Sequence, residues 1–232
     1  MISISYPFVN IHTHHTSSPR YEILNCHITD DIPDNHALQY SVGLHPWDAS
    51  YTTWNRYKEQ VIFYGALENV VSVGETGIDG LRGVSKNEQQ DIFLEHVQIA
   101  EELQKPIIIH CVRAFQEIIS CKKSMQSTVP WIFHGFASRR SVAETVLSHG
   151  CFLSFGAAIL HNVPHLEEVC RMVPENMFFI ENDDKTVPVS NIYEKIADLR
   201  SIPLQYLQEL LYKQWQRIFF RHIVTDDTKY SL

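Results

Sequence analysis

Residues 70–110 read VVSVGETGIDGLRGVSKNEQQDIFLEHVQIAEELQKPIIIH. The run VVSVGE at the start of this stretch and the run PIIIH at its end are short and apolar, which is typical of buried strands. Between them, Ser85 and Glu88 form a capping box, and apolar residues recur at helical spacing until Lys105 and Pro106 end the helix. The stretch therefore predicts one strand–helix–strand unit of a parallel sheet.

The same alternation extends in both directions along the chain. Downstream, we expect strands at 131–134, 151–156 and 177–181, and helices at 114–123, 138–149, 162–173, 189–200 and 203–221. Upstream, we expect strands at 8–12, 21–28 and 40–46, and a helix at 53–67. Eight parallel strands predict an α/β fold, a TIM-like (β/α) barrel whose functional residues lie at the carboxyl ends of the strands.

The first two strand–helix units are abbreviated. Only eight residues separate His12 from Tyr21, and residues 29–39 have room for one helical turn at most. We therefore expect a barrel that is distorted or partly open on this side. Because no linker or low-complexity segment interrupts the pattern, the chain from 1 to 232 is expected to form one domain.

Composition narrows the class of protein. Apolar residues make up 44% of the chain and charged residues 20%, which excludes a disordered or fibrous protein. No apolar stretch approaches the ~20 residues of a membrane span, and the N-terminus lacks the features of a signal peptide, so we expect a cytoplasmic protein without membrane contact. The formal charge of −8 provides no basic field for nucleic acid. A phosphodiesterase with this sequence would need another source of positive charge.

Side chains that can bind metal stand at the predicted strand ends. His12 and His14 alternate along the first strand, so both imidazoles point to the same side. In a closed barrel the ends of all strands converge on one mouth, and four imidazoles with two carboxylates suit two divalent ions better than one. Imidazoles favour zinc or a transition ion over magnesium, and the five cysteines contain no CxxC pair that would indicate a thiolate site. The predicted ligands are His12, His14, Glu75, His110, His134 and Asp183.

Each of these residues has an ordinary structural alternative. Two histidines on one strand are common without a metal, and Glu75 alone could cap a helix or form a salt bridge with a basic side chain. His110 or His134 alone would more often be a hydrogen-bonded interior histidine. Their joint occurrence at the ends of five predicted strands is what predicts a metal site.

Six motifs in this order resemble those of the TatD family of metal-dependent deoxyribonucleases, in the amidohydrolase superfamily: NIHTHH, SVGLHP, VGETGID, PIIIHC, FHGF and IEND. The resemblance runs from about Asn10 to Phe219. It implies a TIM-like barrel with two divalent metal ions (Zn, Mn or Mg), and a DNA or nucleotide-like phosphodiester substrate. It also implies the distribution of the ligands: His12, His14 and Asp183 on one ion, His110 and His134 on the other, and Glu75 between them.

The sequence departs from the family patterns in the walls of the predicted site. Asn10 replaces the usual Asp of D-x-H-x-H, and Val112 stands where a basic residue often follows the fifth-strand histidine. Asp184 and Lys185 replace a small residue and a proline after E-T-D. The segment 15–40 is far shorter than two full units. These changes affect the expected substrate more than the expected metal chemistry.

Three residues are predicted to contact the substrate: His45, Trp47 and Arg113. Trp47 could stack a nucleobase, although a packed indole in a Pro-Trp turn is an equal alternative, and His45 could likewise belong to that turn. Arg113 is adjacent to the position where the family often has its basic residue. The other histidines, His27 among them, are expected on the surface or in packing.

Together these features predict a metal-dependent hydrolase, most simply a deoxyribonuclease of the 3'–5' exonuclease type. Asp183 is the expected general base and Glu75 the expected bridging ligand, with Glu181 as the rival base. One alternative keeps the site and changes the bond to that of a small amide, ester or phosphoester. A second alternative is a non-catalytic binding protein with a retained metal site. Nothing in the sequence indicates an obligate protein partner.

Overall fold

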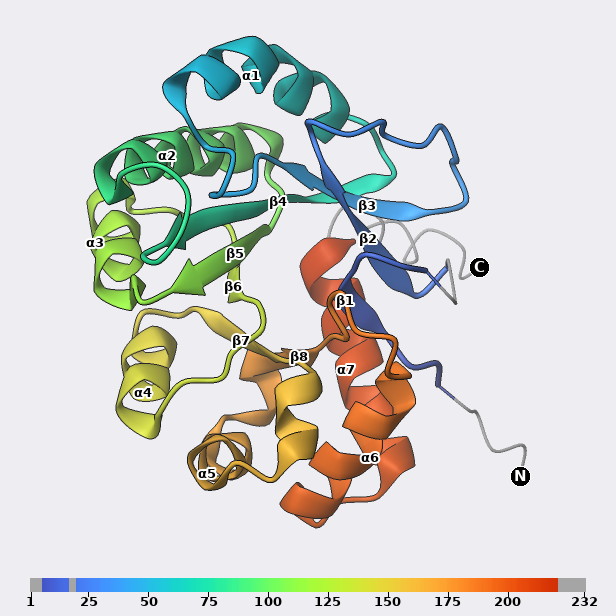
Figure 1. Ribbon diagram of the computed structural model, residues 1–232. Helices are drawn as coiled ribbons and strands as arrows, with labels where there is room; N and C mark the ends of the chain where they lie inside the picture. Colours follow the sequence, from blue (N-terminus) through green and yellow to red (C-terminus); the bar gives the residue numbers. More distant parts are fainter. Residues whose placement is uncertain (1–5, 17–19, 221–232) are drawn as a thin grey trace, which may run out of the picture.

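The computed structural model describes residues 6–16 and 20–220. Its centre is a sheet of eight parallel strands that follow one another in chain order (Figure 1). The strands are β1 (Asn10–Thr13), β2 (Glu22–His27), β3 (Gln39–Gly43), β4 (Val70–Asp79), β5 (Ile107–Val112), β6 (Trp131–Phe133), β7 (Phe152–Phe155) and β8 (Phe178–Ile180). The predicted TIM-like architecture is confirmed, and each expected strand forms.

A single bridge closes the barrel at its mouth. Strands β1 and β8 form no regular ladder, but Thr13 pairs with Asp183 in an isolated parallel bridge. There the Asp183 N–H donates to the His12 carbonyl, and the His14 N–H donates to the Asp183 carbonyl, both at 3.1 Å. The closing backbone contact is thus made by the same segments that carry the predicted metal ligands.

Seven α-helices and two short 3₁₀ helices, η1 (Ala157–His161) and η2 (Glu175–Met177), surround the described part of the sheet. The α-helices are α1 (Tyr51–Gly65), α2 (Lys86–Leu103), α3 (Phe115–Met125), α4 (Arg140–Ser148), α5 (Pro164–Met172), α6 (Val189–Arg200) and α7 (Leu204–Phe219). The predicted cap of α2 is present, since the Ser85 hydroxyl accepts from the Glu88 N–H. Among the residues described between β1 and β3 there is no helix, as the short spacings predict.

Strand β4 is longer than its apolar run. Its apolar run ends at Glu75, which Gly74 and Gly77 flank, but the strand continues to Asp79. Both glycines have positive φ, and a Cβ on Gly77 would lie 2.0 Å from the His110 carbonyl oxygen of β5. The glycines therefore allow β4 to lie close against β5, and the pairing register shifts between Val73 and Thr76.

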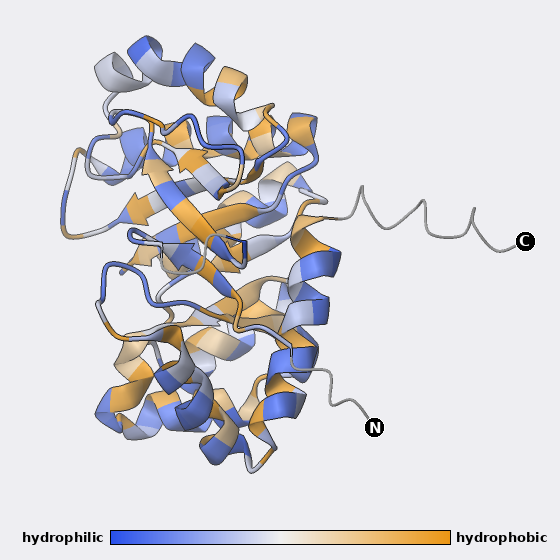
Figure 2. Cartoon of the chain, turned by 90° about the vertical axis from the view of Figure 1, so that its right-hand side faces the viewer, coloured by the Kyte–Doolittle hydropathy of each residue, from blue (hydrophilic) through white to orange (hydrophobic). Residues whose placement is uncertain are grey.

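The core lies between the sheet and the helices. Hydrophobic side chains line the strands and the inner faces of the helices, while the outward faces are hydrophilic (Figure 2). The arrowheads of the strands point to one side in this view, so the carboxyl ends form one edge of the molecule. In the described residues, no helix combines the length and apolar character that a membrane crossing needs.

Candidate metal centre

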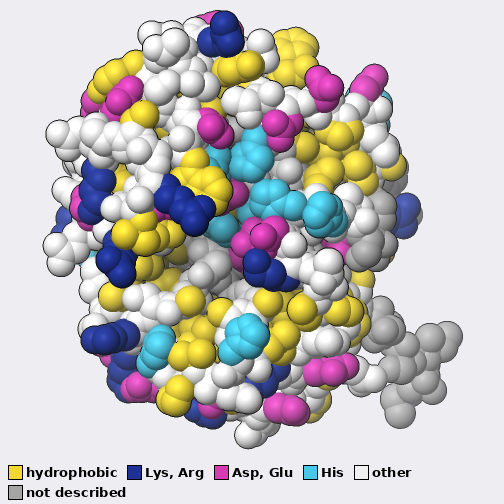
Figure 3. Space-filling model, viewed as in Figure 1, with side chains coloured by type: hydrophobic (Ala, Val, Ile, Leu, Met, Phe, Trp, Pro, Cys, Tyr) yellow, Lys and Arg dark blue, Asp and Glu magenta, His cyan; other side chains and the backbone are white. Residues whose placement is uncertain are grey.

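A pocket of about 350 Å³ opens at the carboxyl ends of the strands. Histidines gather in a hollow on this face, with acidic side chains beside them and hydrophobic and basic side chains on the rim (Figure 3). The lining residues are His14, His27, His45, Trp47, Asp48, Glu75, His110, His134, Asp183, Asp184 and Lys185. The predicted ligand His12 lies fully buried beneath them. The structure thus brings all six predicted metal ligands to one place.

The first cluster combines two imidazoles of β1 with two carboxylates. The His12 Nε2 atom lies 3.4 Å from Asp183 Oδ1 and 3.5 Å from Glu75 Oε2. The His14 Nε2 atom lies 3.4 Å from the same Asp183 oxygen and 4.0 Å from the same Glu75 oxygen. Two ligands bound at ~2.0–2.1 Å to a tetrahedral ion are about 3.4 Å apart, so these spacings fit ligands of a common cation.

The second cluster surrounds the other oxygen of Glu75. The His110 Nδ1 and His134 Nε2 atoms each lie 2.8 Å from Glu75 Oε1, and the His45 Nε2 atom lies 3.2 Å from it. Glu75 is buried, with only 5% of its side chain exposed. Its two oxygens therefore face two different groups of imidazoles.

A buried carboxylate stands behind each of two imidazoles in the second cluster. The second ring nitrogen of His110, Nε2, lies 3.3 Å from Asp79 Oδ2. The second ring nitrogen of His134, Nδ1, lies 3.2 Å from Glu181 Oε1. A carboxylate in this position holds the proton on the nearer nitrogen and leaves the other lone pair free for a metal. In His110 and His134 that free nitrogen is the one that faces Glu75.

His45 has the opposite arrangement. Its Nδ1 atom accepts the backbone N–H of Trp47 at 3.2 Å, so the neutral ring carries its proton on Nε2. That nitrogen faces Glu75 and lies 3.3 Å from His110 Nδ1. A protonated Nε2 donates a hydrogen bond rather than binding a metal.

The donor set fits divalent cations. Both ring nitrogens of His12 are fully buried and make no hydrogen bond among the described residues, which is costly unless another group satisfies them. The ligands combine imidazoles and carboxylates without a thiolate, a set that suits zinc or manganese. The residues present thus fit the binding of divalent metal.

The pKa shifts of the site residues also favour positive charge in the site. Burial and His134 lower the pKa of His12, but the carboxylates of Asp183 and Glu75 outweigh them and raise it to about 9. Burial opposes ionisation of Glu75, yet the surrounding imidazoles, His134 foremost, hold its pKa well below the usual range. The pKa of Asp183 is likewise lowered despite burial, chiefly by His12 and His14. The carboxylates stay ionised and the site favours positive charge, whether carried by protons or by metal.

Two supporting residues were not identified from the sequence. The Asn25 Oδ1 atom accepts the Glu75 N–H at 3.0 Å, and its Nδ2 donates to Glu75 Oε2 at 3.2 Å, so Asn25 orients the central carboxylate. Asp79 supports His110 and also accepts the indole N–H of Trp47 at 2.6 Å. The signal for Asp79 was its place as the last residue of the motif VGETGID, whereas an asparagine within β2 carries no comparable pattern.

Asn10, which replaces the usual Asp of the family pattern, contacts Asn182. The Asn10 amide donates to Asn182 Oδ1 at 2.8 Å, and its own Oδ1 accepts the Asn182 N–H at 3.3 Å. Asn182 occupies the middle position of the family's E-T-D, where this chain also departs from the pattern. The two changes therefore lie against each other and link β1 to the segment after β8, beside the ligands rather than among them.

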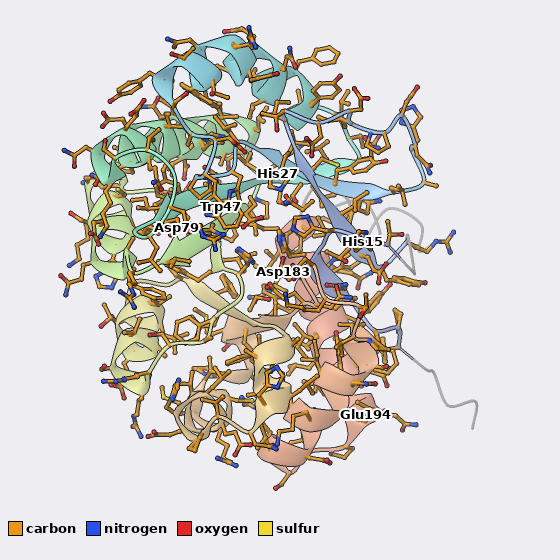
Figure 4. The ribbon with its side chains drawn as sticks, viewed as in Figure 1. His15, His27, Trp47, Asp79, Asp183 and Glu194 are labelled. Carbon is orange, nitrogen blue, oxygen red and sulfur yellow. The ribbon has the colours of Figure 1, made fainter. Side chains whose placement is uncertain are left out.

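The three residues that we predicted to contact the substrate differ in their position relative to the pocket. His45 and Trp47 line the pocket, and Trp47 has 46% of its surface exposed. Arg113 is exposed at the end of β5 and its side chain is not part of the described pocket lining. His27, which we expected in packing or on the surface, lies in the pocket (Figure 4), with its ring centroid 5.6 Å from that of His14 and 5.3 Å from that of His45. Burial lowers the pKa of His27, which keeps the ring neutral.

Solved structures show the same fold. The TatD homologue YjjV from Escherichia coli K12 superimposes with a TM-score of 0.76 at 18% identity, covering 92% of this chain and 98% of its own. A TatD family hydrolase from Entamoeba histolytica gives a TM-score of 0.75 at 13% identity, covering 94% and 99%. At these identities the likeness concerns the fold.

Sequence comparison identifies relatives and a family. A metal-dependent hydrolase from Escherichia coli K12, YcfH, is 26% identical over 210 residues, which is 83% of this chain and 78% of that protein. The 3'-5' ssDNA/RNA exonuclease TatD of the same organism is 27% identical over 177 residues, or 72% and 67%. The family model described as TatD related DNase matches residues 10–220. With the fold and the cluster of imidazoles and carboxylates, this match shows that the chain belongs to the TatD family of metal-dependent hydrolases.

Proposed function

We propose that this protein is a phosphodiesterase that removes nucleotides from an end of single-stranded DNA. The observation that carries the proposal is the position of Glu75, whose two oxygens separate the imidazoles of β1 from those of β5 and β6. Two divalent ions bound on either side of it would lower the pKa of a water molecule and neutralise charge on the scissile phosphate. They would supply the positive charge that a chain of formal charge −8 lacks.

Residues of the chain would supply the general base, a hydrogen-bond donor and the groups that orient the metal ligands. Asp183 has 35% of its side chain exposed, against 5% for Glu75, so Asp183 is placed to accept a proton from the attacking water. His45 lines the pocket with its Nε2–H against Glu75 Oε1, and on binding of substrate this N–H would donate instead to a phosphate oxygen or to the leaving oxygen. Asp79 and Glu181 hold His110 and His134 in the orientation that binds metal.

The decisive experiment is metal analysis followed by a turnover panel. Elemental analysis of protein saturated with Zn or Mn should give about two ions per chain. The loaded protein is then offered single-stranded DNA, duplex DNA, RNA, a small phosphodiester and small amides. We expect end-labelled single-stranded DNA to shorten stepwise. Activity on small phosphoesters or amides with no change in any nucleic acid would contradict the proposal, as would metal binding without any turnover.

A second candidate is a hydrolase of a small, singly charged substrate. The observation that favours it is the pair of carboxylates at the mouth, since Asp48 and Asp184 line the pocket beside the metal ligands. Lys185 offsets the charge of Asp184, and the remaining negative charge of Asp48 opposes a polyanion more than a small molecule. The same panel separates the two candidates, because the nuclease acts on oligonucleotides and the small-molecule hydrolase does not.

A further inference from the structure

Arg82 lies on the face of the Trp47 indole at the rim of the pocket. The guanidinium carbon is 4.7 Å from the ring centroid, which is the geometry of a cation–π contact. Resting on the proposed function, we propose that Arg82 binds a second, non-scissile phosphate of the nucleic acid substrate. It would thereby favour chains of two or more phosphates over small monoesters.

Trp47 holds a fixed position relative to the metal ligands. Its indole N–H donates to Asp79 Oδ2 at 2.6 Å, and this same oxygen lies 3.3 Å from His110 Nε2. The Trp47 ring centroid is 6.3 Å from that of His110. The Arg82 guanidinium, which rests on this ring, is therefore held beside the second metal cluster. The Trp47 side chain and the Asp79 carboxylate set its distance from His110.

The loop that carries Arg82 is fixed as well. The side chain of Gln89, which is fully buried, accepts the Asp79 N–H and points its Nε2 atom at the carbonyl oxygens of Asp79, Arg82 and Val84, at 3.2, 2.9 and 2.8 Å. Gly83 has a φ of +81°, and a Cβ there would lie 2.6 Å from the Pro46 carbonyl oxygen. The loop after β4 is thus docked on the turn that contains Trp47, so Arg82 is held in place before any substrate binds.

Arg82 has the charge available for a phosphate. Lys185, the other cation at the pocket, pairs with Asp184 at 2.5 Å. Arg82 is exposed and forms no ion pair with a carboxylate among the described residues. A planar guanidinium that is free of a carboxylate presents a fork that matches two phosphate oxygens. Arg82 and Arg113 both lie outside the pocket lining, but Arg82 rests on Trp47, which is part of it.

The test compares Arg82→Gln with Arg56→Gln, an exposed arginine of α1 that carries the same charge but does not rest on the Trp47 ring. Binding of a fluorescent single-stranded DNA pentamer is measured by anisotropy in the Asp183→Asn background, where we expect no cleavage. We expect Arg82→Gln to weaken binding about 10-fold, as for the loss of one charge-assisted hydrogen-bonded pair, and Arg56→Gln to leave it unchanged. Arg82→Lys should recover only part of the loss, since lysine lacks the fork.

A second readout separates this inference from the proposed function. In the otherwise native protein, Arg82→Gln should raise KM for the pentamer and leave kcat/KM for bis(4-nitrophenyl) phosphate, which has one phosphate, unchanged. Equal effects of Arg82→Gln and Arg56→Gln on DNA binding would overturn the inference even if DNA is cleaved. Arg82-dependent binding of DNA that the native protein never cleaves would support the inference and overturn the proposed function. Absence of DNA binding would overturn both.

Discussion

Asp183 and Glu75 contact the same imidazoles, but they differ in access to the pocket. Asp183 is the more exposed carboxylate, and its left-handed backbone, with φ of 56°, turns the chain toward the mouth just after β8. Glu75 lies beneath it, enclosed by His12, His110 and His134. In the proposed function, Asp183 would therefore exchange a proton with the reacting water and Glu75 would hold the two clusters together.

We predict that Asp183→Asn and Glu75→Gln each lower turnover by orders of magnitude, since loss of a general base commonly costs ~10²–10⁴-fold. Only Glu75→Gln should also remove metal from both clusters. Initial rates on single-stranded DNA, metal content and thermal unfolding check the prediction. An Asp183→Asn variant that keeps most of its activity would show that another group takes the proton.

Glu181, the rival base, is placed differently. It is fully buried, and its Oε1 atom accepts the Gly135 N–H at 2.7 Å and lies beside His134. We predict that Glu181→Gln lowers metal affinity by about 10–100-fold and that added metal restores its turnover. Asp183→Asn should not recover in the same titration. If excess metal leaves the Glu181→Gln rate as low as that of Asp183→Asn, then Glu181 acts in the chemistry itself.

At the scale of elements, the Asn10–Asn182 pair adds a side-chain contact to the backbone bridge that closes the barrel between β1 and β8. Asn10→Asp would place a carboxylate against the Asn182 side-chain oxygen, so we predict a loss of about 1–3 kcal/mol in the free energy of unfolding. Adding Asn182→Thr should recover part of this loss, because a hydroxyl can donate to the carboxylate. Urea unfolding of the two single variants and the double variant measures the coupling. Strictly additive effects would mean that the two positions do not interact.

The contact between α2 and the end of β3 makes stability depend on pH. The Nε2 atom of the fully buried His96 accepts the Leu44 N–H at 3.1 Å, and its ring lies against Trp54. Burial lowers the pKa of His96 to about 4. The unfolded chain takes up this proton near pH 6.5 and the folded protein near pH 4. The free energy of unfolding therefore falls as the pH drops from about 6.5 to about 4, by roughly 3 kcal/mol from this group.

His96→Gln keeps an acceptor for the Leu44 N–H and removes the titrating ring. We expect its free energy of unfolding to fall less steeply than that of the native protein between pH 6.5 and pH 4, as measured by urea unfolding at several pH values. The comparison cancels the titration of the pocket histidines, which both proteins retain. Parallel curves for the two proteins would show that His96 is protonated equally in the folded and unfolded states.

At the scale of the whole molecule, the charge distribution would limit how the proposed nucleic acid substrate is held. The chain has a formal charge of −8, and we assign the substrate only a few basic contacts. With roughly 0.7 released counterions per contacted phosphate of a single strand, the slope of log affinity against log salt should be about −1 to −2. Anisotropy titrations over a range of salt concentrations measure it. A slope several times steeper would indicate an extended basic track that the described surface does not present.

Much of the fold was predictable from the sequence because strand and helix periodicities are local. The apolar runs and the Ser85 cap located the elements, and the short spacings around Tyr21 predicted a barrel with two abbreviated units. The length of β4 was not predictable in this way. A glycine such as Gly77 suggests a turn when only the sequence is known, and its use in bringing β4 against β5 depends on a strand about thirty positions later in the chain.

By itself the sequence determined the fold class and the six candidate ligands, since a histidine or carboxylate at the end of an apolar run is visible without coordinates. Only the tertiary structure decided how these candidate ligands are arranged in two clusters around Glu75. The register of the strands places one Glu75 oxygen toward β1 and the other toward β5 and β6, gives His45 a proton donor's orientation, and sets Asn25 and Asp79 behind the ligands. It also puts Arg82 rather than Arg113 on Trp47. The physical reason is that hydrogen-bond direction and charge pairing depend on distances between segments that are remote in the chain, which no local pattern encodes.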